Sequence, residues 1–155
     1  MSKEKIIDKA RVKDIVSDLK KKGRKIVFTN GCFDLLHVGH IRYLAEAKKL
    51  GDILFIGLNA DKSVSLIKPG RPVIAEKERA EVLSALEMVD YIALFSEDTP
   101  YELIKEVQPD VLVKGADWQI KDIVGNDIVK DVRAIPLVEG KSTSKIIEKI
   151  QKSGN

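Results

Sequence analysis

Short apolar runs alternate with longer segments of helical periodicity along this chain, and this alternation constrains the fold more than any other feature. Strands are predicted at 25–30, 53–58, 91–95, 111–114 and 132–137. Helices are predicted at 6–22, 41–50, 75–88, 100–107 and 142–151, with a short one at 123–130, and an irregular loop at 62–74. Strands joined by helices make right-handed crossovers and therefore a parallel sheet.

The predicted strands are almost continuously apolar, which is typical of a sheet buried on both faces. The expected fold is therefore α/β, a Rossmann-like open parallel sheet of about five strands with helices on both faces. A length of 155 residues suits a single domain, placed at 1–155, with 1–24 as an N-terminal helical extension.

Composition excludes several classes of protein. The formal net charge is +3, and the 27 basic and 24 acidic residues are interspersed, which disfavours a nucleic-acid partner. No apolar run is long enough to span a membrane, so no membrane partner is expected. A single cysteine cannot form an internal disulfide, and the N-terminus lacks the apolar core of a signal peptide. The expected compartment is the cytoplasm.

The first predicted strand leads into a turn at 31–40, the histidine turn, which holds both histidines of the chain. His37 and His40 are three residues apart at the start of a helix, so both imidazoles lie on one face. Gly39 leaves room for a phosphate, and the helix N-terminus adds amide donors and a positive partial charge. The pattern predicts a polyphosphate cradle. The alternatives are a capping histidine beside an incidental one, or a metal pair, although no third ligand completes a zinc site.

Ligands of open parallel sheets bind outside the carboxyl ends of the strands. Besides the histidine turn, three segments follow predicted strands, namely 59–72, 115–118 and 140–144. In the last of these, Ser142 and Thr143 place hydroxyls beside unpaired helix amides, which suits either the β- and γ-phosphates of a nucleotide or an ordinary N-cap.

Two of these segments resemble a known family. The sequence at 31–40 is similar to the signature of the HxGH nucleotidyltransferases, and 139–146 resembles their serine/threonine-rich motif at the start of the last helix. These enzymes transfer a nucleoside monophosphate from an NTP to a phosphate-bearing acceptor and release pyrophosphate. The resemblance implies the same reaction here.

Over most of its length the chain resembles the nucleotidyl-transferring domain of bacterial heptose kinase/adenylyltransferases, through 27–34, 70–73, 97–100, 112–117 and 135–140. The activity implied is transfer of AMP from ATP to D-glycero-β-D-manno-heptose 1-phosphate by in-line attack, without a covalent intermediate. One alternative is glycerol-3-phosphate cytidylyltransferase, which has Arg-Thr where this chain has Leu137-Val138. Another is a non-catalytic nucleotide sensor. The chain also lacks, at 130–132, the Gly-Gly turn common in the family.

The resemblance assigns roles by motif. Catalytic roles go to His37, His40 and Lys68. Nucleotide binding goes to Cys32, Phe33, His37, Gly39, His40, Arg79, Gly115, Asp117, Gly140, Ser142, Thr143 and Ser144, and substrate binding to Asp34, Lys68 and Trp118. The partners implied are ATP and a sugar phosphate, with a homodimer allowed. The cofactor implied is Mg²⁺, held mainly by the phosphates, with no protein ligand assigned.

Several of these side chains have a plain alternative role. Asp34 either helps to hold Mg²⁺ or braces the amides of the turn. Asp117 binds a sugar hydroxyl or the nucleotide ribose, or else caps its loop. Trp118 stacks on a ligand or covers the core. Lys68 and Arg79 face phosphates, or are an ordinary loop lysine and an ordinary surface charge.

Overall fold

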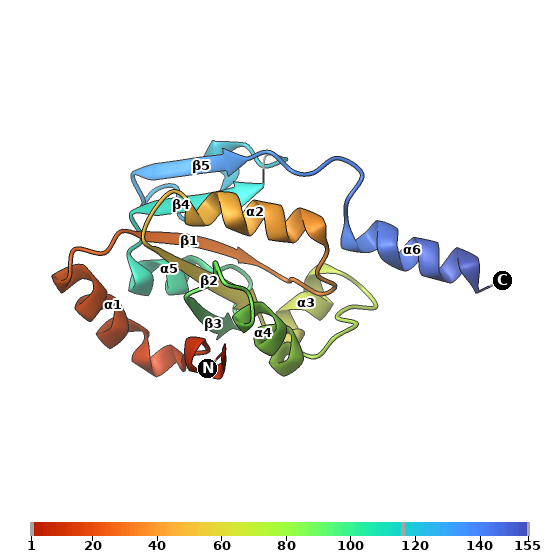
Figure 1. Ribbon diagram of the computed structural model, residues 1–155, viewed down its shortest axis with the longest axis horizontal. Helices are drawn as coiled ribbons and strands as arrows, with labels where there is room; N and C mark the ends of the chain where they lie inside the picture. The colour runs from red at the N-terminus through yellow and green to blue at the C-terminus, as the bar shows by residue number, and fades with distance from the viewer. Residues whose placement is uncertain (1, 116, 155) are drawn as a thin grey trace.

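The computed structural model describes residues 2–115 and 117–154, and within these ranges one sheet of five parallel strands forms the centre of the molecule (Figure 1). The strand order is β3-β2-β1-β4-β5. The predicted α/β Rossmann-like fold is confirmed. The strands are β1 (Ile26–Gly31), β2 (Ile53–Asn59), β3 (Tyr91–Phe95), β4 (Val111–Gly115) and β5 (Asp131–Ile135).

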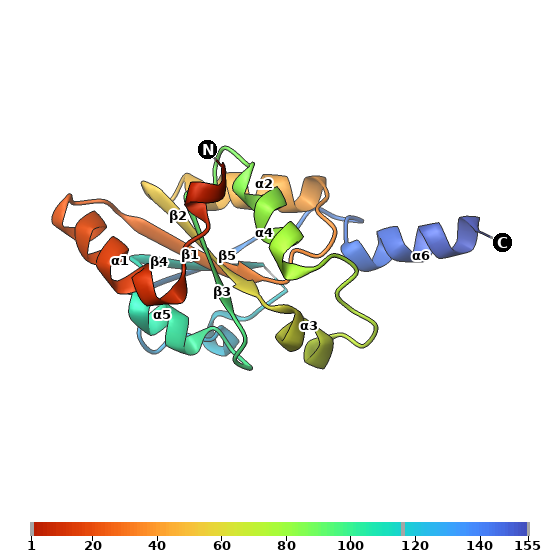
Figure 2. The ribbon, with the colours of Figure 1, turned by 90° about the horizontal axis from the view of Figure 1, so that it is seen from below.

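Helices cover both faces of this sheet, because alternate side chains of each strand point to opposite sides. Phe28 and Phe55 pack with α1 and α5 on one face, whereas Val27 and Leu54 pack with α2 and α4 on the other. Figure 2 shows the two helix pairs on opposite sides of the strands. The helices are α1 (Val12–Lys21), α2 (Val38–Lys48), α3 (Asp61–Ile67), α4 (Glu76–Ser84), α5 (Tyr101–Val107) and α6 (Thr143–Ser153), with short 3₁₀ turns η1 (Ser2–Lys5), η2 (Lys9–Arg11) and η3 (Ile120–Asp122).

The strand order reverses between β1 and β4, which makes their carboxyl ends the place where this fold binds ligands. The two strands pair at Val27 with Val111 and at Phe28 with Leu112. Because both strands continue beyond these pairs, as far as Gly31 in β1, an opening forms at the carboxyl edge of the sheet. The histidine turn and the segment after β4 lie on its two sides.

The predicted N-terminal extension is part of the core. Ile6 forms an isolated parallel bridge with Ile92 of β3, and the amide of Ile7 donates to the carbonyl of Ile92. The predicted helix at 6–22 therefore begins later, after Asp8 accepts a hydrogen bond from the amide of Ala10. The apolar side of α1 then packs on the sheet, so residues of this segment help to bury β1 and β2.

Two predictions about irregular segments are corrected by the structure. The loop predicted at 62–74 contains α3 in its first half, because its helix-breaking residues begin only at Pro69. The short helix predicted at 123–130 is a series of turns, with the 3₁₀ turn η3 just before it. There Gly125 has φ +97, a left-handed conformation that interrupts a helix.

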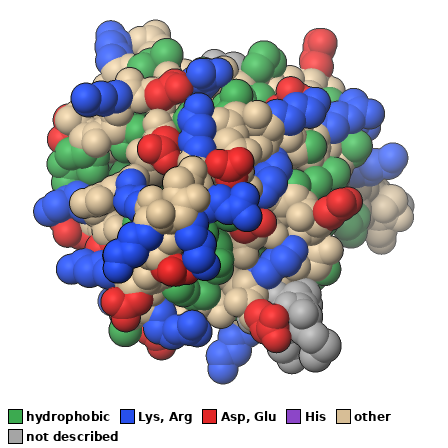
Figure 3. All heavy atoms as spheres, turned by 60° about the vertical axis from the view of Figure 1, so that its left-hand side comes forward, with side chains coloured by type: hydrophobic (Ala, Val, Ile, Leu, Met, Phe, Trp, Pro, Cys, Tyr) green, Lys and Arg blue, Asp and Glu red, His purple; other side chains and the backbone are tan. Residues whose placement is uncertain are grey.

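The surface shows no bias toward one sign of charge on the face that carries the end of α1. Figure 3 shows basic and acidic side chains interspersed across it. Among the helices of the described ranges, none combines the length and the apolar character that crossing a bilayer requires. Helix α6 projects from the body of the molecule, and none of its residues is buried (Figure 1).

Candidate active site

A cavity of about 320 Å³ opens at the carboxyl ends of β1 and β4. Its walls come from the histidine turn, the segment after β4 and the start of α6, which lie far apart in the sequence. Three residues assigned to the site, Arg79, Trp118 and Gly140, lie outside its lining. The twelve that line it are Cys32, Phe33, Asp34, His37, Gly39, His40, Lys68, Gly115, Asp117, Ser142, Thr143 and Ser144.

The two histidines cap the start of α2 and face each other. Nδ1 of His37 accepts a hydrogen bond of 3.1 Å from the amide of Gly39, and Nδ1 of His40 accepts one of 3.3 Å from the amide of His37. The ring centroids are 3.9 Å apart. Because each Nδ1 accepts a hydrogen bond, the proton of each neutral imidazole is on Nε2. Each ring therefore has one N–H to donate to a ligand.

Both imidazoles are neutral at pH 7. The pKa of His40 is lowered to about 4, mainly by burial and in addition by its neighbours His37 and Lys68. The pKa of His37 is lowered by burial and then by Lys141. A bound polyphosphate would reverse this effect, because an anion favours the charged form of an imidazole.

The backbone between β1 and α2 holds the histidine pair against the sheet. Phe33 has φ +46, a left-handed conformation that is strained for a bulky side chain. Its buried ring packs 5.4 Å from that of His40, centroid to centroid. A Cβ added to Gly39 would lie 2.8 Å from Cε1 of His37 and 3.3 Å from Cβ of Lys141, so glycine is required where α6 approaches this turn.

The start of α6 is joined to the histidine turn. Ser142 is the N-cap and accepts a hydrogen bond of 3.1 Å from the amide of Lys145. The hydroxyl of Thr143 donates to the carbonyl of Leu35 at 2.9 Å. The residues that begin the helix therefore line the same cavity as the two histidines. Gly140, at φ +74, shapes the turn that precedes them.

The carboxylate of Asp34 holds the loop after α3. It accepts hydrogen bonds of 2.9 Å from the amides of Val73 and Ile74, and Nη1 of Arg71 lies 3.7 Å from Oδ2. Nη2 of Arg71 also donates to the hydroxyl of Ser144 at 3.3 Å. Asp34 therefore braces amides, although they belong to the loop at 73–74 and not to its own turn. Arg71, which the sequence did not single out, connects this loop to α6.

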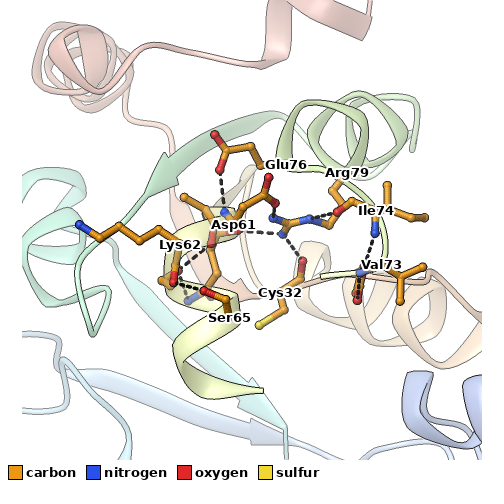
Figure 4. Close-up of polar contacts among 12 residues, drawn as sticks. Cys32, Asp61, Lys62, Ser65, Val73, Ile74, Glu76 and Arg79 are labelled. Atoms are coloured by element: carbon orange, nitrogen blue, oxygen red, sulfur yellow. Dashed lines mark hydrogen bonds and ion pairs between the residues drawn. The ribbon is translucent and has the colours of Figure 1, made fainter. Parts of the chain in front are cut away.

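Arg79 lies outside the lining of the cavity, a position that does not match its assignment to nucleotide phosphates. Figure 4 shows its guanidinium pointing toward Cys32 and Asp61. Arg79 is 2% exposed, and its guanidinium donates to the carbonyls of Cys32, Asn59 and Ile74 at 2.6, 2.8 and 2.9 Å. Its remaining bond, of 2.8 Å, goes to the carboxylate of Asp61. The guanidinium thus ties together the histidine turn, the end of β2, the start of α3 and the loop before α4.

After β4, the two predicted site residues Asp117 and Trp118 differ in their position relative to the cavity. Asp117 lines the cavity, whereas the ring of Trp118 is 45% exposed and lies outside it, 5.5 Å from Nζ of Lys114. At this position Trp118 does not cover the core, whereas its stacking on a ligand stays a prediction. Ala116, which belongs to the same motif, lies outside the described residues.

The sequence reasoning missed two lysines of the cavity, Lys114 and Lys141. Lys141 follows Gly140 directly, and Lys114 is the one charged residue of the apolar strand β4. A charge at the carboxyl end of a buried strand was the signal that could have identified Lys114. With Lys68, three lysines and two carboxylates line the cavity, so the charge of its lining is positive.

The sequence profile described as cytidylyltransferase-like matches residues 28–153, a stretch that begins in β1 and ends in α6. The chain belongs to the cytidylyltransferase-like family. This membership confirms the predicted resemblance and the prediction of a nucleotidyltransferase.

Curated relatives match this cytidylyltransferase-like chain over nearly its whole length. "Bifunctional protein HldE" of Wolinella succinogenes is 52% identical over 98% of this chain and 32% of the relative. The protein of the same name from Nitratiruptor sp. is 53% identical over 97% of this chain and 33% of the relative. The chain thus spans about a third of the length of these relatives.

Two solved structures share the cytidylyltransferase-like fold. The lipopolysaccharide core biosynthesis protein from Thermoplasma volcanium is 30% identical, has a TM-score of 0.64, and aligns over 77% of this chain and all of that one. The pantoate-beta-alanine ligase from Francisella tularensis, crystallised with beta-gamma ATP and beta-alanine, is 18% identical. Its TM-score is 0.63 over 95% of this chain and 77% of that one, a likeness of fold alone.

Proposed function

We propose that this chain transfers AMP from ATP to D-glycero-β-D-manno-heptose 1-phosphate, giving ADP-heptose and pyrophosphate. The observation that carries the proposal is that the histidine pair and the start of α6 line one cavity together with three lysines. The acceptor follows from the resemblance to the nucleotidyl-transferring domain of heptose kinase/adenylyltransferases, which the relatives of about 50% identity support.

The triphosphate is placed between two groups of donors. The β- and γ-phosphates lie at the start of α6, where unpaired helix amides and the ammonium of Lys141 supply positive potential. The α-phosphate lies beside His37 and His40, whose Nε2–H groups donate to its oxygens. Nε2 carries a proton both in this neutral tautomer and in the protonated imidazole, so the donors stay in place as the charge on the phosphate changes.

The reaction is a single in-line displacement. An oxygen of the acceptor phosphate forms a bond to the α-phosphorus, the bond from that phosphorus to the bridging oxygen breaks, and its electron pair leaves with pyrophosphate. Since the attacking phosphate is already anionic, no general base is required. Catalysis is therefore positioning together with stabilisation of the charge that grows on pyrophosphate, a role for Lys68, Lys141 and the α6 amides.

The resemblance also implies Mg²⁺. Among the described residues, no three His, Cys, Asp or Glu side chains cluster in a way that could hold a metal ion. The cavity lining has two carboxylates, and that of Asp34 already accepts hydrogen bonds from two amides, which leaves Asp117. This donor set fits an ion held mainly by phosphate oxygens and water, with Asp117 as the protein ligand available. Such an ion would neutralise the charge of pyrophosphate.

A pyrophosphate-release assay with the four NTPs and a panel of sugar phosphates tests the proposal. The expected result is release with ATP and heptose 1-phosphate, with ADP-heptose identified by mass spectrometry. Release with CTP and glycerol 3-phosphate would instead indicate the cytidylyltransferase. Binding of ATP without release in the presence of any acceptor would indicate a nucleotide sensor.

The remaining expectations concern assembly and compartment. We propose a homodimer, as the resemblance implies, and α6 offers a surface for it because Ile150 is 61% exposed there. Light scattering of the wild type and of Ile150→Lys tests this, with a monomeric wild type as the contradicting result. Since both substrates are phosphorylated metabolites, we propose that the reaction takes place in the cytoplasm.

A further inference from the structure

Lys114 differs from the other two lysines of the cavity in how firmly it is held. Lys68 and Lys141 are exposed, whereas Lys114 is the last residue but one of β4 and is partly buried. Its Nζ donates to the carbonyl of Asn30 at 3.3 Å and lies 5.5 Å from the ring centroid of Trp118. An ammonium has three N–H donors, so the bond to Asn30 fixes the group and leaves donors for a ligand.

Lys141 and Lys114 belong to different walls of the cavity. Lys141 precedes α6 and lies against the histidine turn, where a Cβ added to Gly39 would be 3.3 Å from the Cβ of Lys141. Lys114 is on β4 and donates to the carbonyl of Asn30 in β1, at the opening between these two strands. One lysine is therefore on the α6 side of the cavity and the other is on the sheet side.

The positions of the two lysines bear on the displacement, an inference that rests on the proposed function. The attacking and leaving oxygens lie on opposite sides of the α-phosphorus. If pyrophosphate leaves toward Lys141 and α6, the acceptor approaches from the other side, and Lys114 is the lysine held on the sheet, away from α6. We propose that Lys114 binds the phosphate group of the acceptor and holds its attacking oxygen in line. No proton leaves the lysine in this step.

The surroundings of Lys114 suit an anion. Burial lowers its pKa first of all, Cys32 and Asp117 oppose that effect, and Lys68 adds to it. An acceptor phosphate would remove the cost of keeping this ammonium charged and partly dehydrated. A charge-assisted hydrogen bond is also stronger in a partly buried place than in water.

Three substitutions separate the acceptor end from the nucleotide end. Lys114→Met keeps the aliphatic stem beside Trp118 and removes the charge, and Lys114→Arg keeps the charge. Lys141→Met makes the same change on the α6 side of the cavity. Lys77→Met, on the exposed side of α4, is the control for loss of a surface charge. Thermal unfolding of each variant shows whether it is folded.

Binding is measured without turnover, by calorimetry with α,β-methylene-ATP and then with inorganic phosphate added to the protein saturated with that analogue. We expect Lys114→Met to bind the analogue as the wild type does and phosphate at least about tenfold more weakly, the loss of one charge-assisted hydrogen bond. Lys141→Met should bind the analogue more weakly and bind phosphate as the wild type does. Equal weakening of both ligands in Lys114→Met, or no phosphate site in the wild type, would overturn the proposal.

Turnover gives an independent measurement. With the acceptor that supports pyrophosphate release in the wild type, Lys114→Met should raise the acceptor KM by about tenfold or more and leave the KM for ATP unchanged. Lys114→Arg should recover part of the loss. If heptose 1-phosphate supports no release, the proposed function fails, whereas the role of Lys114 is still decided by phosphate binding.

Discussion

The hydroxyl of Thr143 donates a hydrogen bond of 2.9 Å to the carbonyl of Leu35, across 108 residues of sequence. One partner begins α6 and the other lies within the histidine turn. Since α6 projects from the body of the molecule and has no buried residue, this bond is an important part of its attachment. It holds the start of α6 beside the histidine turn, where both segments line the cavity.

Thr143→Val keeps the shape of the side chain and removes that bond. We expect the KM for ATP to rise by about tenfold, because the start of α6 is then no longer held at the histidine turn. The free energy of unfolding should fall by only about 1 kcal/mol. The control is Ser153→Ala, which removes a hydroxyl bonded within the last turn of the same helix. An unchanged KM in Thr143→Val would show that the bond does not position α6.

His40→Ala removes one of the two imidazole donors placed at the α-phosphate. Losing one such donor typically costs about 10²–10³ in rate, so we expect turnover to fall by at least that factor. The fold should survive, because His40 caps a helix that the core also holds. Pyrophosphate release and circular dichroism measure the two effects. Arg42→Ala, on the exposed side of α2, is the control. Nearly normal turnover in His40→Ala would contradict the assigned role.

The low pKa of His40 makes stability depend on pH in one direction. Its pKa is about 4 in the folded chain and about 6.5 when unfolded, so between these values the unfolded chain binds the extra proton. Stability is therefore fully present above pH 6.5 and is lost as pH falls toward 4. Between pH 7 and pH 5, the melting temperature of the wild type should fall roughly 2–5 °C more than that of His40→Gln. Parallel curves for the two proteins would contradict this.

Much of the fold and of the site could be predicted from local pattern. The run before Gly31 and the helical pattern after His40 specify a strand and a helix, and a parallel sheet then brings the carboxyl ends of its strands to one edge. The pairing of the histidine turn with 142–144 followed from that geometry and from the family resemblance. The strand and helix around the histidine turn and the motif at 142–144 each lie within one contiguous segment. Patterns within one segment can be recognised directly in the sequence.

What could not be predicted depends on contacts between distant segments. From the sequence, Arg79 is interpreted as an exposed charge on a helix or as a phosphate ligand. The neighbouring sequence does not show that three carbonyls and a carboxylate converge on its guanidinium. From the sequence, Lys114 is only the last residue of a predicted strand. Its proposed role depends on its bond to Asn30 and on the opening between β1 and β4, which the sequence does not show. Such residues are found only once the segments are packed together.

Arg79→Met tests whether this arginine supports the site or touches the nucleotide. The substitution leaves the carbonyls of Cys32 and Asn59 buried without their donor, so we expect the free energy of unfolding to fall by about 2–4 kcal/mol, measured in urea. Binding of α,β-methylene-ATP should weaken along with this loss, because the histidine turn and the start of α3 lose their connection. Arg42→Met, an exposed arginine of α2, should change neither quantity. A phosphate ligand would behave differently, since its loss would weaken nucleotide binding and leave the unfolding free energy unchanged. That second result would contradict a supporting role and make Arg79 a phosphate ligand.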